Sequence, residues 1–195
     1  MPYRQLYSRR QAEATFLTRN WYIEDAKEVS WVAEGSLNIK VTDHLLKERV
    51  RGLIIWHDEN FFPDLDAGYT IIIAEGLPQE TERFVVIKEL MHCYLGPFGG
   101  DYATSNPHSL ESHMRALFGN SFTVRSRAYE AETKALWMAL GVLTPENYRL
   151  QLRQEVLVSK VKTFENVAQE LMIPVHTAKA LLSKQFEDEI AHILK

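Results

Sequence analysis

The pattern of apolar and polar residues changes once along the chain and divides it into a strand-forming part and a helix-forming part. The first part holds three short runs rich in Val, Ile and aromatic residues, separated by segments that contain Gly, Pro and Asp. We predict strands over residues 36–42, 50–57 and 69–74. From about residue 79 onward, apolar residues recur at spacings of three and four, which is typical of helices. This order indicates an α+β fold in which a small three-stranded sheet precedes a mainly helical half.

Capping residues and prolines mark the boundaries of the helices. Asn106 and Thr144 each stand before a proline, which favours the first turn of a helix, and Gly119 ends the helix between them. We predict helices over residues 8–18, 82–95, 107–118, 126–142, 145–159, 163–171 and 175–194, the last of them broken near Lys184.

The chain reads as one folded unit, because its sequence has no internal repeat and no Pro- or Ser-rich linker. We expect one domain over residues 1–160 and a helical tail over residues 161–195 that packs on it and is not an independent domain. Within the tail, residues 167–184 follow the apolar spacing of a helix-turn-helix core. Its second helix carries few basic groups, among them Lys179 and Lys184, so we expect packing in preference to DNA binding.

The composition narrows the class of protein. Of the 195 residues, 46% are apolar and 11% aromatic, which is enough for an ordinary core. The 22 basic and 26 acidic residues give a net charge of -4, which argues against bulk electrostatic binding to nucleic acid. Cys93 is the only cysteine, no secretory signal stands at the start, and no apolar run is long enough to span a bilayer. We therefore expect a cytoplasmic protein without membrane contacts.

Residues 82–95 form the most informative segment, because as a helix they are apolar almost all round. After Arg83, only Lys88, Glu89 and His92 interrupt this surface with charged or imidazole groups. Positions 88 and 92 lie one turn apart and position 89 lies three before 92, so the three groups cluster on one side. Charged groups buried in such a helix must pair with one another or hold something.

The spacing from Lys88 to His92 is that of the zinc-binding sequence H-E-x-x-H with its first histidine changed. In the intact sequence two imidazoles bind zinc, and the glutamate acts as general base on the metal-bound water. Lysine ligates zinc only after losing its proton, and its ammonium brings a positive charge to the place of the cation. Lys88 therefore does not simply replace a histidine.

A second helix offers a further carboxylate to the same site. Glu132, Ala135 and Ala139 share one face of the helix predicted over residues 126–142, and the small alanines allow another helix to approach closely. We predict that this helix packs beside the one that bears Lys88 and His92. The Glu132 carboxylate should then lie close enough to one of them for a charge-assisted contact.

Together these two segments resemble the ImmA/IrrE-type metallopeptidases of bacteria, phages and mobile elements. The family pattern is an R-F-x-x-A-H-E-x-x-H helix preceded by strands, followed by an E-x-x-A-x-x-x-A-x-x-L-x-P helix. The chain shows residues of this pattern in the same order, with Lys88 in place of the first histidine: Arg83, Phe84, Lys88, Glu89, His92, Glu132, Ala135, Ala139, Val142 and Pro145.

The resemblance spans roughly residues 30–185 and implies a zincin-like metallopeptidase fold with a helical tail. We place the zincin-like domain over residues 1–160. It places Glu89 at the position of the general base and His92 and Glu132 at the positions of two zinc ligands. Lys88 departs from the pattern at the first ligand, so we expect a catalytically impaired pseudo-peptidase without a cofactor. The resemblance further implies a regulatory or binding module of phage or mobile-element type, with a protein or peptide partner.

Two other functions stay open at this stage. One is an active zinc metalloendopeptidase with Glu89 as base, and the other is a DNA-binding regulator that acts through residues 163–184. The four polar residues can also be read as a buried ion-pair network that satisfies itself. His108 and His113 are candidates for a missing ligand, although their polar neighbours favour surface positions. We expect Cys93 to be a core residue.

Overall fold

The computed structural model describes residues 2–29, 32, 36–45, 50–57, 68–95 and 127–195. It contains a three-stranded mixed sheet in the order β1 (Ser36–Thr42), β3 (Gly68–Ala74) and β2 (Gly52–His57). Strand β3 pairs parallel with β1 and antiparallel with β2. The predicted α+β class and all three predicted strands are confirmed, each strand beginning within two residues of its expected start.

The central strand leads directly into the helix that carries the candidate chemistry. Ile71 and Ile73 of β3 are buried, and helix α4 (Gln79–Leu90) packs against the sheet with almost every residue from Arg83 onward buried. A Cβ added at Gly52 of β2 would collide with Val85 Cγ1 and lie 3.6 Å from Glu89 Cγ. The absence of a side chain at this glycine therefore brings α4 close to the sheet beside Glu89. The chain continues from α4 into a 3-10 turn, η1 (Met91–Tyr94).

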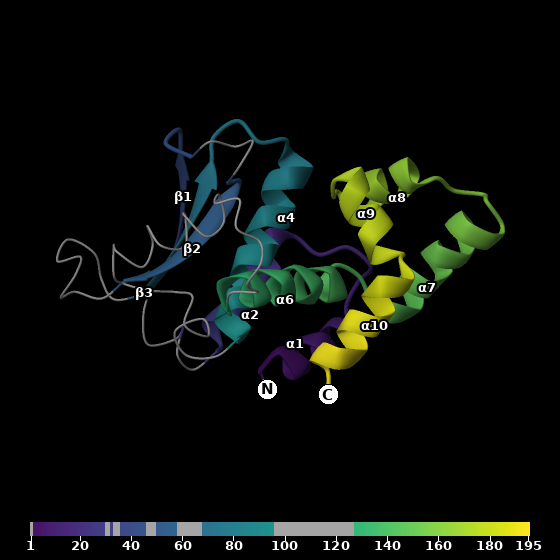
Figure 1. Ribbon diagram of the computed structural model, residues 1–195, viewed down its shortest axis with the longest axis horizontal. Helices are drawn as coiled ribbons and strands as arrows, with labels where there is room; N and C mark the ends of the chain where they lie inside the picture. Colours follow the sequence, from purple (N-terminus) through teal and green to yellow (C-terminus); the bar gives the residue numbers. More distant parts are fainter. Residues whose placement is uncertain (1, 30–31, 33–35, 46–49, 58–67, 96–126) are drawn as a thin grey trace.

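Helix α6 (Arg127–Val142) lies across α4 and forms the centre of the helical half (Figure 1). Ala135 and Ala139 on this helix are fully buried, as expected for a face that another helix approaches closely. At Gly141 an added Cβ would lie 2.5 Å from Tyr3 Oη and 2.7 Å from Ile190 Cδ1. The two ends of the chain therefore pack against α6 at the same point, and Figure 1 shows both termini there.

The helix predicted over residues 8–18 is wrong. The chain forms α1 (Pro2–Arg10), a non-helical connection, and α2 (Arg19–Lys27), which we did not predict. The physical reason lies in the buried Arg10 side chain, which donates hydrogen bonds to four backbone carbonyls. These belong to Ala14, Thr15, Val142 and Leu143. The carbonyls that a longer helix would bond internally are satisfied by a side chain, so the connection needs no helix.

The helices predicted after residue 126 are confirmed to within about two residues, including the break near Lys184. They are α6, α7 (Glu146–Arg153) with the π-helical turn η3 (Gln154–Val158), α8 (Phe164–Leu171), α9 (Val175–Leu181) and α10 (Lys184–Ile193). Thr163 and Asn166 form a capping box at the start of α8, and Ser183 caps α10. The helix predicted over residues 107–118 lies outside the described residues.

Buried arginines tie the tail to the rest of the chain. Arg83 of α4 donates to the carbonyl of Leu171 at 3.0 Å, and Arg149 of α7 donates to that of Leu181 at 3.4 Å. The boundary at residue 160 remains a prediction, because a contact does not show whether a segment folds alone. Within the part of the chain that the structure describes, no helix is long and apolar enough to cross a membrane.

Candidate functional site

The candidate site lies where the end of α4 meets α6. Lys88 and Glu89 stand in the last turn of α4, His92 follows in η1, and Glu132 comes from α6. The predicted approach of the two helices is confirmed, since Glu132 contacts both Lys88 and His92. Residues 44 positions apart in the sequence thus form one polar cluster within an apolar interface. We call these four residues the Lys88 cluster.

The ammonium of Lys88 bridges the two carboxylates of the cluster. Its Nζ lies 2.8 Å from Glu89 Oε1 and forms a short ion pair with Glu132 Oε2. The two carboxylates thereby share the Lys88 ammonium, which joins α4 to α6. A charge-assisted contact of this kind is stronger than a neutral hydrogen bond.

His92 contacts the other oxygens of the same carboxylates. Its Nε2 lies 2.9 Å from Glu132 Oε1 and 3.8 Å from Glu89 Oε2. One ligand-type atom from each of Glu89, His92 and Glu132 lies within 4.8 Å of the other two, a spacing small enough to surround one ion. All three residues that the resemblance places around a metal are therefore gathered at one point.

The cluster is open on one side only. Glu89 and His92 are buried, whereas the side chains of Lys88 and Glu132 retain 17% and 22% of their exposure. Exposure of this size is too small for water to screen the ion pairs strongly. The contacts therefore act as a partly buried network and not as a surface salt bridge.

The surroundings hold both Lys88 and Glu132 in their charged forms. Burial alone would lower the pKa of Lys88, but the charges of Glu89 and Glu132 outweigh it and raise this pKa above its ordinary value. Burial alone would raise the pKa of Glu132, but contact with His92 and the charge of Lys88 lower it to about 2. At neutral pH the cluster thus contains an ammonium locked between carboxylates.

This arrangement does not fit a zinc ion. Zinc needs lone pairs, and the raised pKa of Lys88 keeps the proton on the nitrogen that stands at the first ligand position. The ammonium also engages the carboxylates of Glu89 and Glu132, the groups that would otherwise face the metal. A divalent ion would have to displace a bound cation of the protein itself. Among the described residues, the first ligand position thus offers zinc an ammonium and no lone pair.

Of the other candidate residues, the structure describes Cys93 alone. Cys93 is fully buried, and burial raises the pKa of its thiol to about 12, so it carries no thiolate at neutral pH. This agrees with a core residue. His108 and His113 lie outside the described residues.

Sequence reasoning missed a second polar network behind the cluster. Asp25 of α2 is buried and accepts hydrogen bonds from Arg9 at 2.5 Å and from the Tyr94 hydroxyl at 2.6 Å. The three residues connect α1, α2 and η1, and they fix the 3-10 turn that also carries His92. No local sequence pattern predicts this network, because none of the three residues belongs to a recognisable motif in its own segment.

The tail shows the two helices expected of the helix-turn-helix spacing. On α9, Thr177, Ala178 and Leu181 are buried, while His176 and Lys179 are exposed. Lys179 lies 5.8 Å from the centre of the Phe164 ring, which ties its ammonium to the tail itself. The exposed face of α9 therefore offers few free cations to a phosphate backbone.

Comparison of the chain with protein-family models, with curated proteins and with solved structures finds no match. Functional assignment therefore depends on the residues and contacts described above.

Proposed function

We propose that the chain is a zincin-like module of the ImmA/IrrE type that has lost its metal and its peptidase activity and acts by binding a protein or peptide. The observation that carries the proposal is the Lys88 ammonium held between Glu89 and Glu132. A positive charge stands where a metallopeptidase would need one, but this charge has no open coordination position and activates no water.

The arrangement of elements supports the zincin-like part of the proposal. A small mixed sheet precedes α4, this helix carries Glu89 and His92, and a later helix supplies Glu132. The order and the convergence both agree with the pattern of two zinc-binding helices. Ala135 and Ala139, fully buried on α6, agree with that pattern too.

The loss of catalysis follows from the role of each residue. Glu89 would serve as general base only if its carboxylate faced a nucleophilic water, but one of its oxygens accepts a hydrogen bond from Lys88. His92 Nε2 and Glu132 Oε1 lie 2.9 Å apart, so the two groups that would bind the metal contact each other. A module of this kind acts through its surface, and we propose a regulatory role of phage or mobile-element type.

The test is the metal content and peptidase activity of the natural chain, purified without chelator. We expect no stoichiometric zinc by elemental analysis, and no cleavage of unstructured polypeptide after incubation with added zinc. Full occupancy that falls when His92 or Glu132 is replaced by alanine would instead establish the metallopeptidase alternative. Binding to duplex DNA that weakens with salt would favour the DNA-binding alternative.

A further inference from the structure

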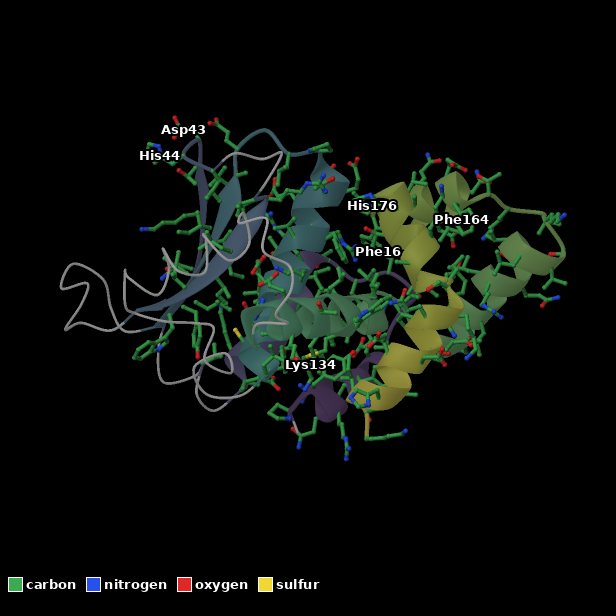
Figure 2. All side chains as sticks on the ribbon, in the orientation of Figure 1. Phe16, Asp43, His44, Lys134, Phe164 and His176 are labelled. Atoms are coloured by element: carbon green, nitrogen blue, oxygen red, sulfur yellow. The ribbon has the colours of Figure 1, made fainter. Side chains whose placement is uncertain are left out.

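A groove of about 400 Å³ lies at the opposite end of α4 from the Lys88 cluster. Three segments line it: residues 16–19 before and at the start of α2, residues 79–83 at the start of α4, and Met172 in the turn between α8 and α9. Figure 2 shows Phe16 and His176 in this region, between α4 and the α8–α9 pair. The volume falls within the range of about 300–1,000 Å³ that is usual for small-molecule sites.

Arg83 brings a buried positive charge to the wall of this groove. Its residue is 6% exposed, and its guanidinium donates to the carbonyls of Leu171 and Leu17 and lies 4.6 Å from the centre of the Phe16 ring. Its Nε is buried and has no acceptor among the described residues. Burial lowers the pKa of Arg83, and no carboxylate among the described residues offsets this effect. The guanidinium of Arg83 is therefore stabilised by carbonyl dipoles and by the Phe16 ring, but no negative charge among the described residues neutralises it.

A second buried guanidinium adds to the same positive field. Arg10 is fully buried, and its guanidinium donates hydrogen bonds to four backbone carbonyls. It lies close enough to Arg83 for their repulsion to contribute to the lowered pKa of Arg83. In a region of low dielectric constant, such charges act over several ångströms with little screening. Arg83 thus brings a positive charge to the groove, and the nearby Arg10, which does not line the groove, adds to that charge.

The rim of the groove presents groups that can contact an anion directly. The first turn of α4 begins at Gln79, and its N-cap residue Pro78 provides no side-chain cap. The positive end of this 12-residue helix therefore faces the groove, together with the acidic Glu80 and Glu82 of the same turn. Arg19 is 45% exposed and pairs with Glu82, which also lines the groove. The Arg19 guanidinium is therefore held at the rim by a contact that an incoming anion can replace.

We propose that this groove binds a small organic anion through a carboxylate or phosphate group. Arg19 and the first turn of α4 contact the charged group, while the buried charges of Arg83 and Arg10 attract it through space. Phe16 and Met172 supply the apolar wall against which the uncharged part of the ligand packs. The ligand class follows from the charges: an amphipathic anion matches both surfaces, whereas a cation would be repelled by the guanidinium of Arg83, which no carboxylate among the described residues neutralises.

The experiment uses the ¹⁵N-labelled full chain and follows the backbone amide of Gln79 and the Nε–H of Arg19 by NMR. The probes are 4-phenylbutyrate, the neutral 4-phenylbutan-1-ol and inorganic phosphate, each added to about 10 mM, which detects dissociation constants in the millimolar range. We expect saturable shifts with phenylbutyrate, with at least about tenfold weaker binding of the alcohol and of phosphate, because each lacks one of the two complementary parts.

Two variants at the rim should move the affinity in opposite directions. Arg19→Gln removes the direct cation and should weaken phenylbutyrate binding about tenfold, whereas Glu82→Gln frees Arg19 and should tighten it several-fold. Arg153→Gln is the matched control, since Arg153 is also a half-exposed arginine that faces a glutamate, Glu187. It should leave the affinity unchanged. Equal binding of the alcohol, no shift with any probe, or the same affinity in both rim variants would each overturn the proposal.

Discussion

Helix α4 buries two cations five residues apart, and the protein satisfies them in opposite ways. Lys88 is surrounded by charge, since two carboxylates contact its ammonium. Arg83 is surrounded by dipoles, since its guanidinium meets carbonyl oxygens and the Phe16 ring. The two sites lie only about 7.5 Å apart along the helix axis. One helix therefore contains both a neutralised cation and an unneutralised one.

The two environments predict different costs in stability when each cation is replaced, because different partner groups are left without it. Without Lys88, two carboxylates face each other with no cation between them, and a buried charge without a partner is very costly. Without Arg83, neutral carbonyl oxygens lose a donor, which costs less for each group. Lys88 therefore stabilises the fold by balancing two carboxylates, whereas Arg83 stabilises it by donating hydrogen bonds to carbonyls.

The largest expected effect comes from replacing the cation of the Lys88 cluster by a metal. Lys88→His removes the ammonium and adds an imidazole one turn before His92, so the variant should bind zinc stoichiometrically while the natural chain does not. Zinc bound at a site formed by folding contributes on the order of 10 kcal/mol of binding free energy. Elemental analysis and thermal unfolding with and without zinc measure both consequences.

The double variant Lys88→His with His92→Ala is the control, because it keeps the new imidazole and removes the old one. It should bind zinc far more weakly than the single variant. A well-folded Lys88→His chain that takes up no zinc would show that the Lys88 cluster is not a former metal site. That result would remove the main support for a zincin-like ancestry, while the ion-pair network itself would stand.

The second effect concerns stability in the absence of metal. Lys88→Met keeps a similar side-chain length and removes the charge, so it should destabilise the protein by about 3 kcal/mol. Lys184→Met is the matched control: Lys184 also contacts two carboxylates, at 2.6 Å in Asp188 and 3.9 Å in Glu187, but it is 71% exposed. Its loss should cost far less than that of Lys88, because water screens an exposed ion pair. Equal costs in urea unfolding would contradict the role given to Lys88.

The third prediction concerns Arg83, the second buried cation of α4, and compares its removal with that of Lys88. Arg83→Met should destabilise the protein by about 2 kcal/mol, because the carbonyls of Leu171 and Leu17 lose their donor. This cost should be the same at pH 5 and pH 8, since no carboxylate among the described residues pairs with Arg83. A strong dependence on pH in this interval would reveal an anionic partner and weaken the comparison.

How far the sequence predicts this structure depends on the range of the interactions. The three strands and the helices after residue 126 follow from local periodicity, turn residues and caps, and they were confirmed. The contact of Glu132 with Lys88 and His92 was also predictable, because each partner lies on a regular helix whose faces can be counted. In a regular helix the spacing of two residues in the sequence fixes their relative positions, so the proximity of these four residues could be predicted.

The arginine networks were beyond such reasoning. Arg10 donates to the carbonyl of Val142, 132 residues away, and nothing near either residue indicates that pairing. A backbone carbonyl is present at every position, so the sequence does not mark which ones accept from a side chain. The helix predicted over residues 8–18 was wrong for this reason: a distant side-chain partner replaced the local hydrogen bonds that a helix would have made.

The smallest expected effect is a change with pH in the cost of Lys88→Met. In the natural chain the pKa of Glu132 is lowered to about 2 from an ordinary value of 4.5, so its contribution to stability is full above pH 4.5 and is lost as pH falls toward 2. The pKa of Lys88 is raised above its ordinary 10.5, so its contribution is full below that value and is lost only in strong alkali. Between pH 5 and pH 8, therefore, neither Lys88 nor Glu132 changes its contribution to stability.

The stability of the Lys88→Met variant, in contrast, should depend on pH within the same interval. Without the ammonium, two desolvated carboxylates repel each other, and the pKa of their first protonation rises in the folded state. The folded variant then binds a proton more readily than the unfolded chain, so its stability increases as pH falls from 8 to 5. The gap between the natural chain and Lys88→Met should narrow by about 1 kcal/mol over this range, because one pKa unit corresponds to about 1.4 kcal/mol. Urea unfolding at pH 5, 6, 7 and 8 measures the gap, and Arg83→Met provides the flat reference. A gap that stays constant, or widens toward pH 5, would mean that Glu89 and Glu132 do not share the charge of Lys88 in solution.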